Sequence, residues 1–400
     1  MGRVPPMFVP AILPLLACAG DPTRDTAATV RDSAGVVIVE NEGPAWSPEE
    51  AWRVTEPAML DIGVVEGAPE YQLYRAASAV RLSDGRIVVA NGGTNELRFY
   101  DATGRHLRSV GREGEGPGEF RDLQRVWQLR GDSLLAYDFF PARLSVFSPT
   151  GEFARSLRVI APDGRQVVVL GPLEDGSLLA WGAPIWAAAG STTGIVRDSV
   201  PYYRYGPEGV LDATLGPFPS MEVYRVVTGD DWRLTSLPFP RLPVSAVAGD
   251  RFHFGPADGY EIQTYTAAGA LERVVRVAST QRSVESEDIE RFRRDRLERA
   301  EREGSRPSME RMLAQMPFPD VMPPYEALAV DAEGHVWVAD YRAGPEEPGT
   351  WKVFSPEGQL LGSVVMPRGI RVLQIGPDFV LGQWLDELDT EHIRLHRLVK

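Results

Sequence analysis

The sequence contains little lysine and almost no cysteine. Among its 42 basic residues only Lys352 and Lys400 are lysines, so arginine supplies nearly all of the positive charge. The formal net charge is −14, the wrong sign for binding a phosphate backbone, which relies on lysine and arginine. We therefore expect no nucleic-acid partner. Cys18 is the single cysteine, so an intramolecular disulfide is excluded in any redox compartment.

Motifs that carry well-known chemistries are also missing. The sequence contains no H-E-x-x-H, no G-x-S-x-G and no G-x-x-x-x-G-K-[ST], which mark zinc peptidases, serine hydrolases and phosphate-binding loops. His392 and His396 are four residues apart, but the apolar residues around them fit a strand, where four residues span roughly 13 Å. One zinc ion cannot join two nitrogens so far apart, because each Zn–N bond is about 2 Å long.

The N-terminus has the features of an export signal. Arg3 precedes an apolar run over residues 7–16, which is too short to span a bilayer as a helix. The sequence Leu-Leu-Ala-Cys ending at Cys18 resembles a bacterial lipobox, and that resemblance implies cleavage before Cys18 and diacylation of its thiol. We expect a signal peptide at 1–17 and a lipidated flexible tether at 18–35. The protein would then sit in the bacterial cell envelope, on the periplasmic or outer-membrane side, touching the membrane through its lipid only. The alternative is an ordinary cleaved signal peptide.

The remainder is globular in composition, with 43% hydrophobic and 24% charged residues. Its strongest internal pattern is a repeated unit of strand, loop, strand, tight turn and strand. Six copies begin at Gly85, Asp132, Gly176, Asp250, Gly334 and Pro377, and glycines close the turns at Gly104, Gly151, Gly209, Gly269 and Gly358. Gly111 to Gly118 follows an outer strand, and we expect it to connect two repeats instead of binding phosphate.

The first strands of the copies are continuously apolar, as in residues 87–90 and 336–339. The next strand of the first copy alternates, with Arg98 and Tyr100 expected on its wetter side. Such patterns are typical of sheets that are stacked on both faces near a common centre. The sequence therefore predicts an all-β, six-bladed β-propeller over residues 36–400.

The last blade lacks an outer strand after Pro377, so we expect a strand from the N-terminal side to complete it. The candidates are residues 52–55 and residues 59–63. Completion of the blade in this way would remove an exposed sheet edge.

The first copy also carries a family resemblance. Its segment from Val88 to Gly104, Val-Val-Ala-Asn-Gly-Gly-Thr-Asn-Glu-Leu-Arg-Phe-Tyr-Asp-Ala-Thr-Gly, is followed by Gly-Arg-Glu-Gly-Glu-Gly-Pro-Gly-Glu-Phe ending at Phe120. Together they resemble NHL-repeat six-bladed propellers. The resemblance is concentrated in residues 84–123 and, more weakly, 329–363. It implies a fold and does not imply an activity.

Residues 283–315 interrupt the strand pattern. Ile289, Phe292, Leu297 and Ala300 lie near one side of a predicted helix, and Ser286 precedes two acids at its start. We expect a helical insertion between blades four and five that packs on the propeller. A partner-binding or lid element is the alternative.

One position is topologically equivalent in all six copies, where the second strand enters its outward loop. It is occupied by Asn91, Asp138, Gly182, Pro256, Asp340 and Gln383. In a propeller these loops gather on one face, where carboxylate and amide oxygens suit Ca²⁺. A resemblance to propeller lactonases, which hold a central Ca²⁺, gives a metal site at Asn91, Asp138 and Asp340 as an alternative. Our first expectation is that short polar side chains here bond their own turns.

Aromatic residues near the same loops complete the candidate site, since rings can stack on a sugar or hold a peptide, although packing between blades is their commoner use. We predict a non-catalytic binding or scaffold lipoprotein without a cofactor, exposed outside the cytoplasmic membrane, whose ligand is a protein, a peptide or a glycan. The alternative is a Ca²⁺-dependent lactonase-type hydrolase or lyase. The predicted ligand-binding residues are Asn91, Asp138, Trp181, Asp340, Tyr341, Gln383 and Trp384.

Overall fold

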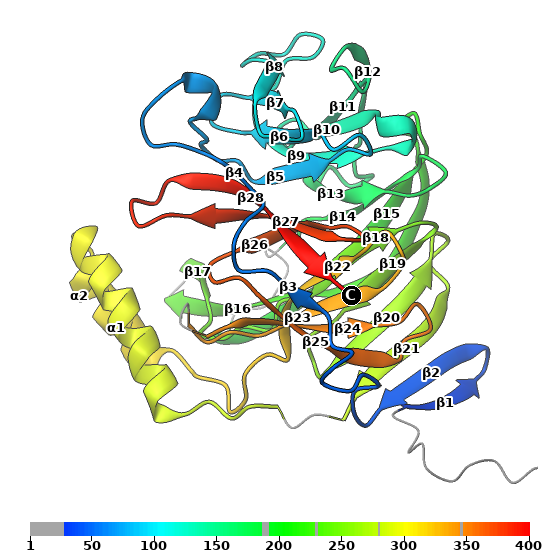
Figure 1. Ribbon diagram of the computed structural model, residues 1–400. Coiled ribbons are helices and arrows are strands. Elements are labelled where there is room, and N and C mark those ends of the chain that lie inside the picture. The colour runs from blue at the N-terminus through cyan, green and yellow to red at the C-terminus, as the bar shows by residue number, and fades with distance from the viewer. Residues whose placement is uncertain (1–27, 186–191, 229–230, 279–280, 345–346) are drawn as a thin grey trace, which may run out of the picture.

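The computed structural model describes residues 28–185, 192–228, 231–278, 281–344 and 347–400. Within these residues the strands form six β-sheets (Figure 1). The first strands of successive sheets, β5, β9, β13, β18, β22 and β26, lie innermost, and most of them contact their neighbours around the centre. The chain is therefore a six-bladed β-propeller, as its sequence predicts.

Blades 1 to 3 follow one another along the chain. Blade 1 consists of β5 (Ser78–Arg81), β6 (Ile87–Asn91), β7 (Glu96–Tyr100) and β8 (His106–Val110). Blade 2 consists of β9 (Leu123–Gln128), β10 (Leu134–Asp138), β11 (Arg143–Phe147) and β12 (Phe153–Arg158). Blade 3 consists of β13 (Val167–Pro172), β14 (Leu178–Gly182), β15 (Gly194–Tyr205), β16 (Leu211–Thr228) and β17 (Asp231–Ser236). Short 3₁₀ helices, η1 (Pro69–Tyr71) and η2 (Arg130–Asp132), lie in connections.

The remaining blades recruit strands from the N-terminal part of the chain. Blade 4 consists of β18 (Val244–Ala248), β19 (Arg251–Gly255), β20 (Glu261–Thr266) and β21 (Leu271–Val277), extended by β2 (Val36–Asn41) and β1 (Ala28–Ser33). Blade 5 consists of β22 (Tyr325–Val330), β23 (Val336–Asp340), β24 (Gly349–Phe354) and β25 (Leu360–Met366). Blade 6 consists of β26 (Arg371–Ile375), β27 (Phe379–Leu385), β28 (Glu391–Val399), β3 (Arg53–Val54) and β4 (Leu60–Ile62).

Both N-terminal candidates complete the last blade, which confirms the predicted closure. β3 and β4 each pair antiparallel with β28. On the way to blade 6 the chain crosses blade 5, where the backbone amides of Ala45 and Trp46 donate to the carbonyls of Leu360 and Leu361 at 3.0 and 2.7 Å. One N-terminal segment therefore ties three consecutive blades together.

Part of the predicted tether is ordered structure. Residues 28–33 form β1, which pairs antiparallel with β2, while β2 runs parallel to β21. The expectation of an unstructured tether up to residue 35 is wrong for this strand. Pairing with β1 gives the outer edge of β2 backbone partners that the local sequence does not reveal. The signal peptide at 1–17 and Cys18 lie outside the described residues.

The hydrophobic core is divided among the interfaces between blades. Each of six buried clusters joins two adjacent blades, and the cluster that contains Val89 and Leu381 joins blade 1 to blade 6 and so closes the ring. The strand Ile87–Asn91 is buried throughout, as its apolar sequence predicts. Arg98 and Tyr100, expected on a wetter side, are only 4% and 0% exposed. The segment around η1 covers them and accepts their hydrogen bonds through backbone carbonyls.

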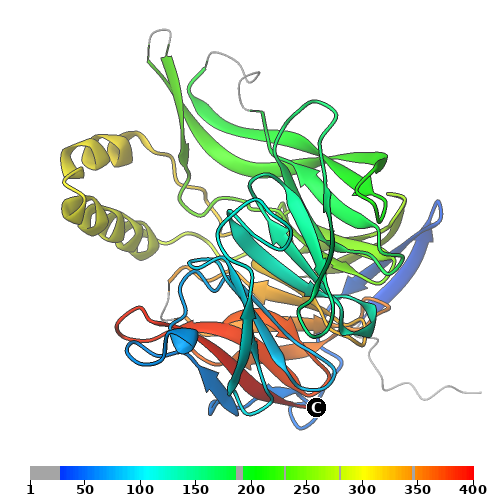
Figure 2. The same ribbon diagram turned by 90° about the horizontal axis from the view of Figure 1, so that it is seen from above.

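The predicted insertion between blades four and five is confirmed. It contains α1 (Ser286–Arg302) and α2 (Arg306–Gln315), which lie side by side at one end of the propeller (Figures 1 and 2). The N-cap is Glu285, one residue before the predicted start, and it forms a capping box with Asp288. Phe292 of α1 packs against Phe239 and Phe318, with ring centroids 5.6 and 5.8 Å away. None of the helices described here is long and apolar enough to cross a membrane.

Candidate ligand-binding face

The six equivalent positions lie at one end of their blades. The register pairs Leu123 with Asp138, Val167 with Gly182, Tyr325 with Asp340 and Arg371 with Gln383, while Asn91 and Pro256 come directly after the pairs Ser78–Ala90 and Val244–Gly255. Each inner strand therefore begins where its second strand ends. The helices follow β21 and precede β22 at this same end. We call it the helix face, and the other end the opposite face.

Two of the predicted oxygen ligands are held by backbone amides of the segments that precede the inner strands. The Asn91 side chain is buried, accepts from the backbone amide of Tyr74 at 2.8 Å and donates to the Thr94 hydroxyl at 2.8 Å. Asp138 has no exposed surface and accepts from the backbone amides of Arg121 and Asp122 at 3.1 and 2.7 Å. The bond from Asn91 to Thr94 lies within the turn, as the sequence favours for short polar side chains. The expectation is wrong for Asp138, because its backbone partners lie 17 and 16 residues earlier in the chain.

Asp138 also forms a buried ion pair. Its Oδ2 accepts from Arg143 Nη2 at 3.0 Å, and the two side chains are 0% and 7% exposed. Arg143 Nη1 donates to the carbonyl of Glu115 at 2.7 Å. Since Glu115 lies in the glycine-rich segment 111–118, this pair fixes the connection between blades 1 and 2, as the sequence predicts for that segment. Phe120, which follows it, is fully buried in the cluster between the two blades.

Asp340 and Gln383 have side-chain partners on neighbouring strands. Lys352 Nζ donates to both Asp340 oxygens at 2.5 and 2.6 Å, and the Tyr260 hydroxyl donates to Oδ1 at 3.2 Å. Burial, together with the Asp340 charge, raises the pKa of Tyr260 well above its ordinary value. Gln383 Oε1 accepts from Arg371 Nε at 2.8 Å. The carboxylates at Asp138 and Asp340 each face a cation of the chain itself.

The predicted aromatic residues do not form one cage. Trp181 packs against the cluster between blades 3 and 4. The Trp384 ring lies 3.3 Å from the guanidinium carbon of Arg394. Tyr341 contacts Phe239 with ring centroids 6.5 Å apart, and burial raises its pKa to about 12. These contacts place each ring in a separate local environment. The three aromatic residues that the sequence predicted for one binding site therefore lie at three separate places.

A small cavity separates α1 from the rest of the helix face. Its volume is about 210 Å³. The lining combines aromatic and charged side chains, namely Phe239, Arg291, Phe292, Asp295, Arg296, Arg299 and Ala343. The helix therefore presents a largely basic surface toward the propeller.

Two arginines at the centre of the helix face were missed by sequence reasoning. Arg125 on β9 and Arg371 on β26 are the exposed residues of the inner strands, whose other described members are buried or half-buried. The sequence feature that could have indicated Arg125 is its position as the one charged residue of the strand Leu123–Gln128. It becomes informative only when the ring places that strand near the axis.

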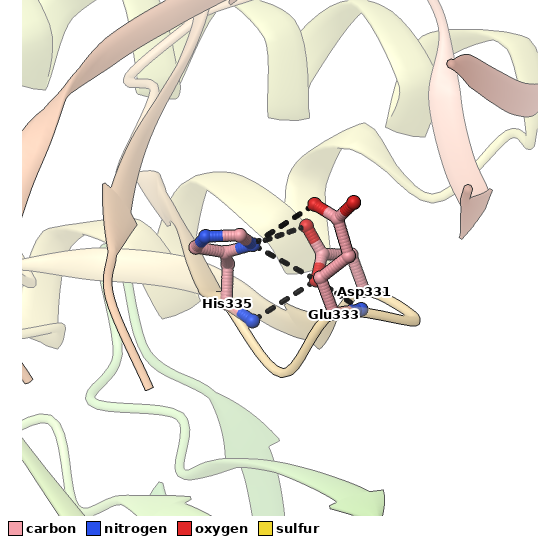
Figure 3. Close-up of side chains that lie close together, drawn as sticks. All are labelled: Asp331, Glu333 and His335. Carbon is pink, nitrogen blue, oxygen red and sulfur yellow. Dashed lines mark hydrogen bonds and ion pairs between the residues drawn. The ribbon is translucent and has the colours of Figure 1, made fainter. Parts of the chain in front are cut away.

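On the opposite face, one group of three side chains has the composition of a metal site (Figure 3). Ligand-type atoms of Asp331, Glu333 and His335 lie within 4.8 Å of one another. Asp331 Oδ1 accepts from the backbone amides of Glu333 and His335, both at 2.9 Å, and Oδ2 accepts from Trp337 Nε1 at 3.1 Å. Glu333 pairs with Lys400. These bonds hold the hairpin between β22 and β23, so the group acts as a turn support.

Comparison with known proteins gives one match by sequence. Residues 69–164 match a family model described as a 6-bladed beta-propeller. This stretch contains η1 and all strands of blades 1 and 2. Among curated proteins, none matches the chain.

Several solved structures are similar in shape. A candidate exported protein of Bacteroides fragilis is 11% identical, with 91% of this chain and 100% of that protein covered and a TM-score of 0.49. A Bacteroides vulgatus protein from a family of unknown function is 9% identical, with coverages of 87% and 99% and a TM-score of 0.49. A catalytically inactive virginiamycin B lyase from Staphylococcus aureus is 9% identical, with coverages of 88% and 100% and a TM-score of 0.42. Likeness at this level carries no statement about function.

Proposed function

We propose that this chain is a non-catalytic binding protein that uses the helix face of its propeller to hold a ligand outside the cytoplasmic membrane. One observation carries the proposal. Asn91, Asp138 and Asp340, the side chains best suited to metal-assisted chemistry, are each engaged by donors of the chain itself. The face is therefore a rigid frame whose polar groups are fixed, which is the property required for selective binding.

The surroundings of α1 support a ligand at this face. Its cavity offers guanidinium groups beside the rings of Phe239 and Phe292, a combination that binds polar ligands with a flat or ring-shaped part. A peptide or a glycan fits this chemistry. A protein partner would use the same surface together with the exposed side of α1.

The proposed location rests on the N-terminal sequence. The lipobox-like residues before Cys18, and the absence of any other cysteine, support an NHL-like propeller lipoprotein. Because β1 begins at Ala28, the propeller would lie close to the membrane surface. Mass spectrometry of the native protein should find a diacylated Cys18 at the mature N-terminus, and Cys18→Ser should release or stall the protein. An unmodified Cys18, or a different mature N-terminus, would refute the anchor.

Binding is tested on the mature chain carrying Cys18→Ser. Peptide and oligosaccharide libraries are screened for an increase in melting temperature, and each hit is retested with Arg299→Gln and Trp384→Ala at the helix face. We expect at least one hit that either variant weakens, while Arg155→Gln on β12, away from the cavity lining, leaves it unchanged. Hits that all variants bind equally would place the ligand elsewhere.

The Ca²⁺-dependent alternative is tested on the same preparation. Elemental analysis should find no stoichiometric metal, and millimolar CaCl₂ should leave the melting temperature unchanged relative to MgCl₂. A ligand that binds only the folded state at 100 times its dissociation constant stabilises it by about 2.7 kcal/mol, so a true site would be visible. Retained calcium, with a stabilisation lost in Asp340→Asn, would replace the binding proposal with a hydrolase or lyase.

A further inference from the structure

The inner strands carry an unusual pair of charges at the helix face. Arg125 lies on β9 of blade 2 and Arg371 begins β26 of blade 6. The inner strand β5 of blade 1 contacts both β9 and β26. Arg125 stands opposite Tyr137 and Arg371 opposite Gln383, so both lie toward the helix-face end of their strands. We call these two residues the axial arginine pair.

The members of the pair differ in how firmly they are held. Arg371 Nε donates to Gln383 at 2.8 Å, and its Nη2 donates to the carbonyl of Ala77 at 2.9 Å. Both acceptors are uncharged. The Arg125 guanidinium has no hydrogen-bond or ion-pair partner among the residues that the structure describes. Arg371 is thus a fixed cation whose Nη1 takes no part in these two bonds. Arg125 is a cation without a counterion among the described residues.

The nearby acids are already committed. Asp122 accepts from Arg75 Nη2 at 2.9 Å and from Gln124 Nε2 at 3.0 Å. Glu391 accepts from the backbone amides of Arg75 and Ala76 at 3.0 and 2.6 Å. These carboxylates hold the edge of blade 1. They do not bond either member of the axial arginine pair.

The electrostatics agree with this geometry. Burial, followed by the charge of Arg371, lowers the pKa of Arg125, although solvent reaches its side chain. Burial also lowers the pKa of Arg371, against the opposing charge of Glu391. Arginine stays protonated in proteins, so the positive charge of Arg371 acts on Arg125 where both side chains have lost part of their hydration. Such an arrangement destabilises the folded chain unless an anion joins it.

We propose that the axial arginine pair binds the oxyanion of a small ligand, a carboxylate or a phosphate group, at the centre of the helix face. The proposal rests on the proposed binding function and names the chemistry of its ligand. Guanidinium groups present planar donor pairs that match both kinds of oxyanion. Gln383 is a positioning residue, because it orients Arg371 before the ligand arrives. Neutral parts of the ligand would extend toward the loops of the face.

The test compares anions at matched ionic strength. The melting temperature of the mature Cys18→Ser chain is followed in sodium citrate, sodium glucuronate, inorganic phosphate and sodium chloride, with glucose as the uncharged counterpart of glucuronate. We expect citrate, glucuronate or phosphate to stabilise the protein in a saturable manner that chloride and glucose do not reproduce. The order among the three identifies whether a carboxylate or a phosphate is the preferred source.

Variants separate this site from general salt effects. Arg125→Gln and Arg371→Gln should each weaken anion binding about 10–100-fold, the loss expected when a charge-assisted hydrogen bond is removed. Arg125→Lys should retain part of the binding. Arg108→Gln is the matched control, because Arg108 is exposed on the outermost strand β8 of blade 1 and loses the same charge. It should bind anions like the parent chain.

A second readout excludes a merely structural role. In anion-free, low-salt buffer Arg125→Gln should melt about 1–2 °C higher than the parent, because it relieves repulsion in the pair. The inference is overturned if anions do not stabilise the parent chain, or if they stabilise Arg125→Gln equally well. It is also overturned if Arg125→Gln melts at a lower temperature than the parent without anions. In that case, library hits that still bind Arg125→Gln would show that the helix face binds uncharged ligands. The proposed binding function would then stand without the anion site. Failure of the function itself would instead appear as retained calcium.

Discussion

The ion pair between Asp138 and Arg143 offers the sharpest test of how this propeller is held together. Changing Asp138 to Asn keeps the size of the side chain and removes its charge. One oxygen becomes an NH₂ group, which would then face the backbone amides of Arg121 and Asp122 or the guanidinium of Arg143, all of which are donors. The substitution therefore creates a donor facing a donor in a place without solvent.

The magnitude follows from burial. Asp138 and Arg143 are 0% and 7% exposed, so neither charge can turn to water when its partner is lost. Removing one member of a buried pair typically costs about 3–5 kcal/mol, because it leaves the other charge uncompensated. We expect Asp138→Asn to lower the free energy of unfolding by this amount. Asp340→Asn, whose pair with Lys352 is 31% and 20% exposed, should cost only about 1 kcal/mol.

The assay is urea unfolding of the mature chain, followed by tryptophan fluorescence and circular dichroism to check that the two transitions coincide. A double-mutant cycle with Arg143→Met isolates the pair, since the double variant should be more stable than Asp138→Asn alone. If Asp138→Asn were no more destabilising than Asp340→Asn, or if the cycle gave no coupling, the assignment of Asp138 as a structural anchor would be wrong. A Ca²⁺-dependent stability of the parent lost in this variant would assign Asp138 to a metal.

Three further predictions concern the N-terminal segment and one buried histidine. Deleting residues 1–34 removes β1, whose side chains are mostly exposed, and should lower the melting temperature only slightly. Deleting residues 1–63 also removes β2, β3 and β4 and exposes edges of blades 4 and 6, so it should lower the melting temperature sharply; equal melting temperatures would reject the closure. Asn41→Ala should cost about 2–4 kcal/mol in urea unfolding, because its side chain bonds the backbone of blades 4 and 5 in the interior, while the exposed Glu40→Ala should be nearly neutral. Burial and then two nearby arginines lower the pKa of His253 to about 4; the unfolded chain therefore binds more protons, and stability should fall by up to about 3 kcal/mol as the pH drops from about 6.5 to 4. In His253→Gln this part of the pH dependence should be absent.

The blade pattern was predictable because it is written in local sequence. Strand, turn and strand lie next to one another along the chain, and each turn needs a glycine that tolerates positive φ. Gly151 shows the constraint, with φ at 85° and a Cβ position that would lie 2.9 Å from Phe99 Cζ. The need for an N-terminal strand was predictable for a similar reason, since a missing strand in the last copy can be counted. The sequence did not show that both candidate strands would take part.

Burial and side-chain partners were predicted less well, because they depend on residues far away in sequence. The alternation at Arg98 and Tyr100 indicated a solvated side, yet the segment around η1, about 30 residues earlier in the chain, covers it. The bond from Asn91 to Thr94 of its own turn followed from general properties of short polar side chains. The bonds of Asp138 did not, because Arg121 and Asp122 lie 17 and 16 residues earlier in the chain. The cation at Asp340 did not, since Lys352 reaches it across a neighbouring strand.

The axial arginine pair combines both difficulties and explains how a strongly acidic chain can hold an anion. Arg125 and Arg371 come together only because the ring closes between blade 6 and blade 1, so no local pattern could pair them. The net charge of −14 describes the protein at long range, where it repels anions. At physiological ionic strength that field decays over about 8 Å, while the pair acts at hydrogen-bond distance in a partly desolvated site. Added salt should therefore ease the approach of an anion, because it screens the net negative charge. It should also weaken the capture of the anion by the axial arginine pair.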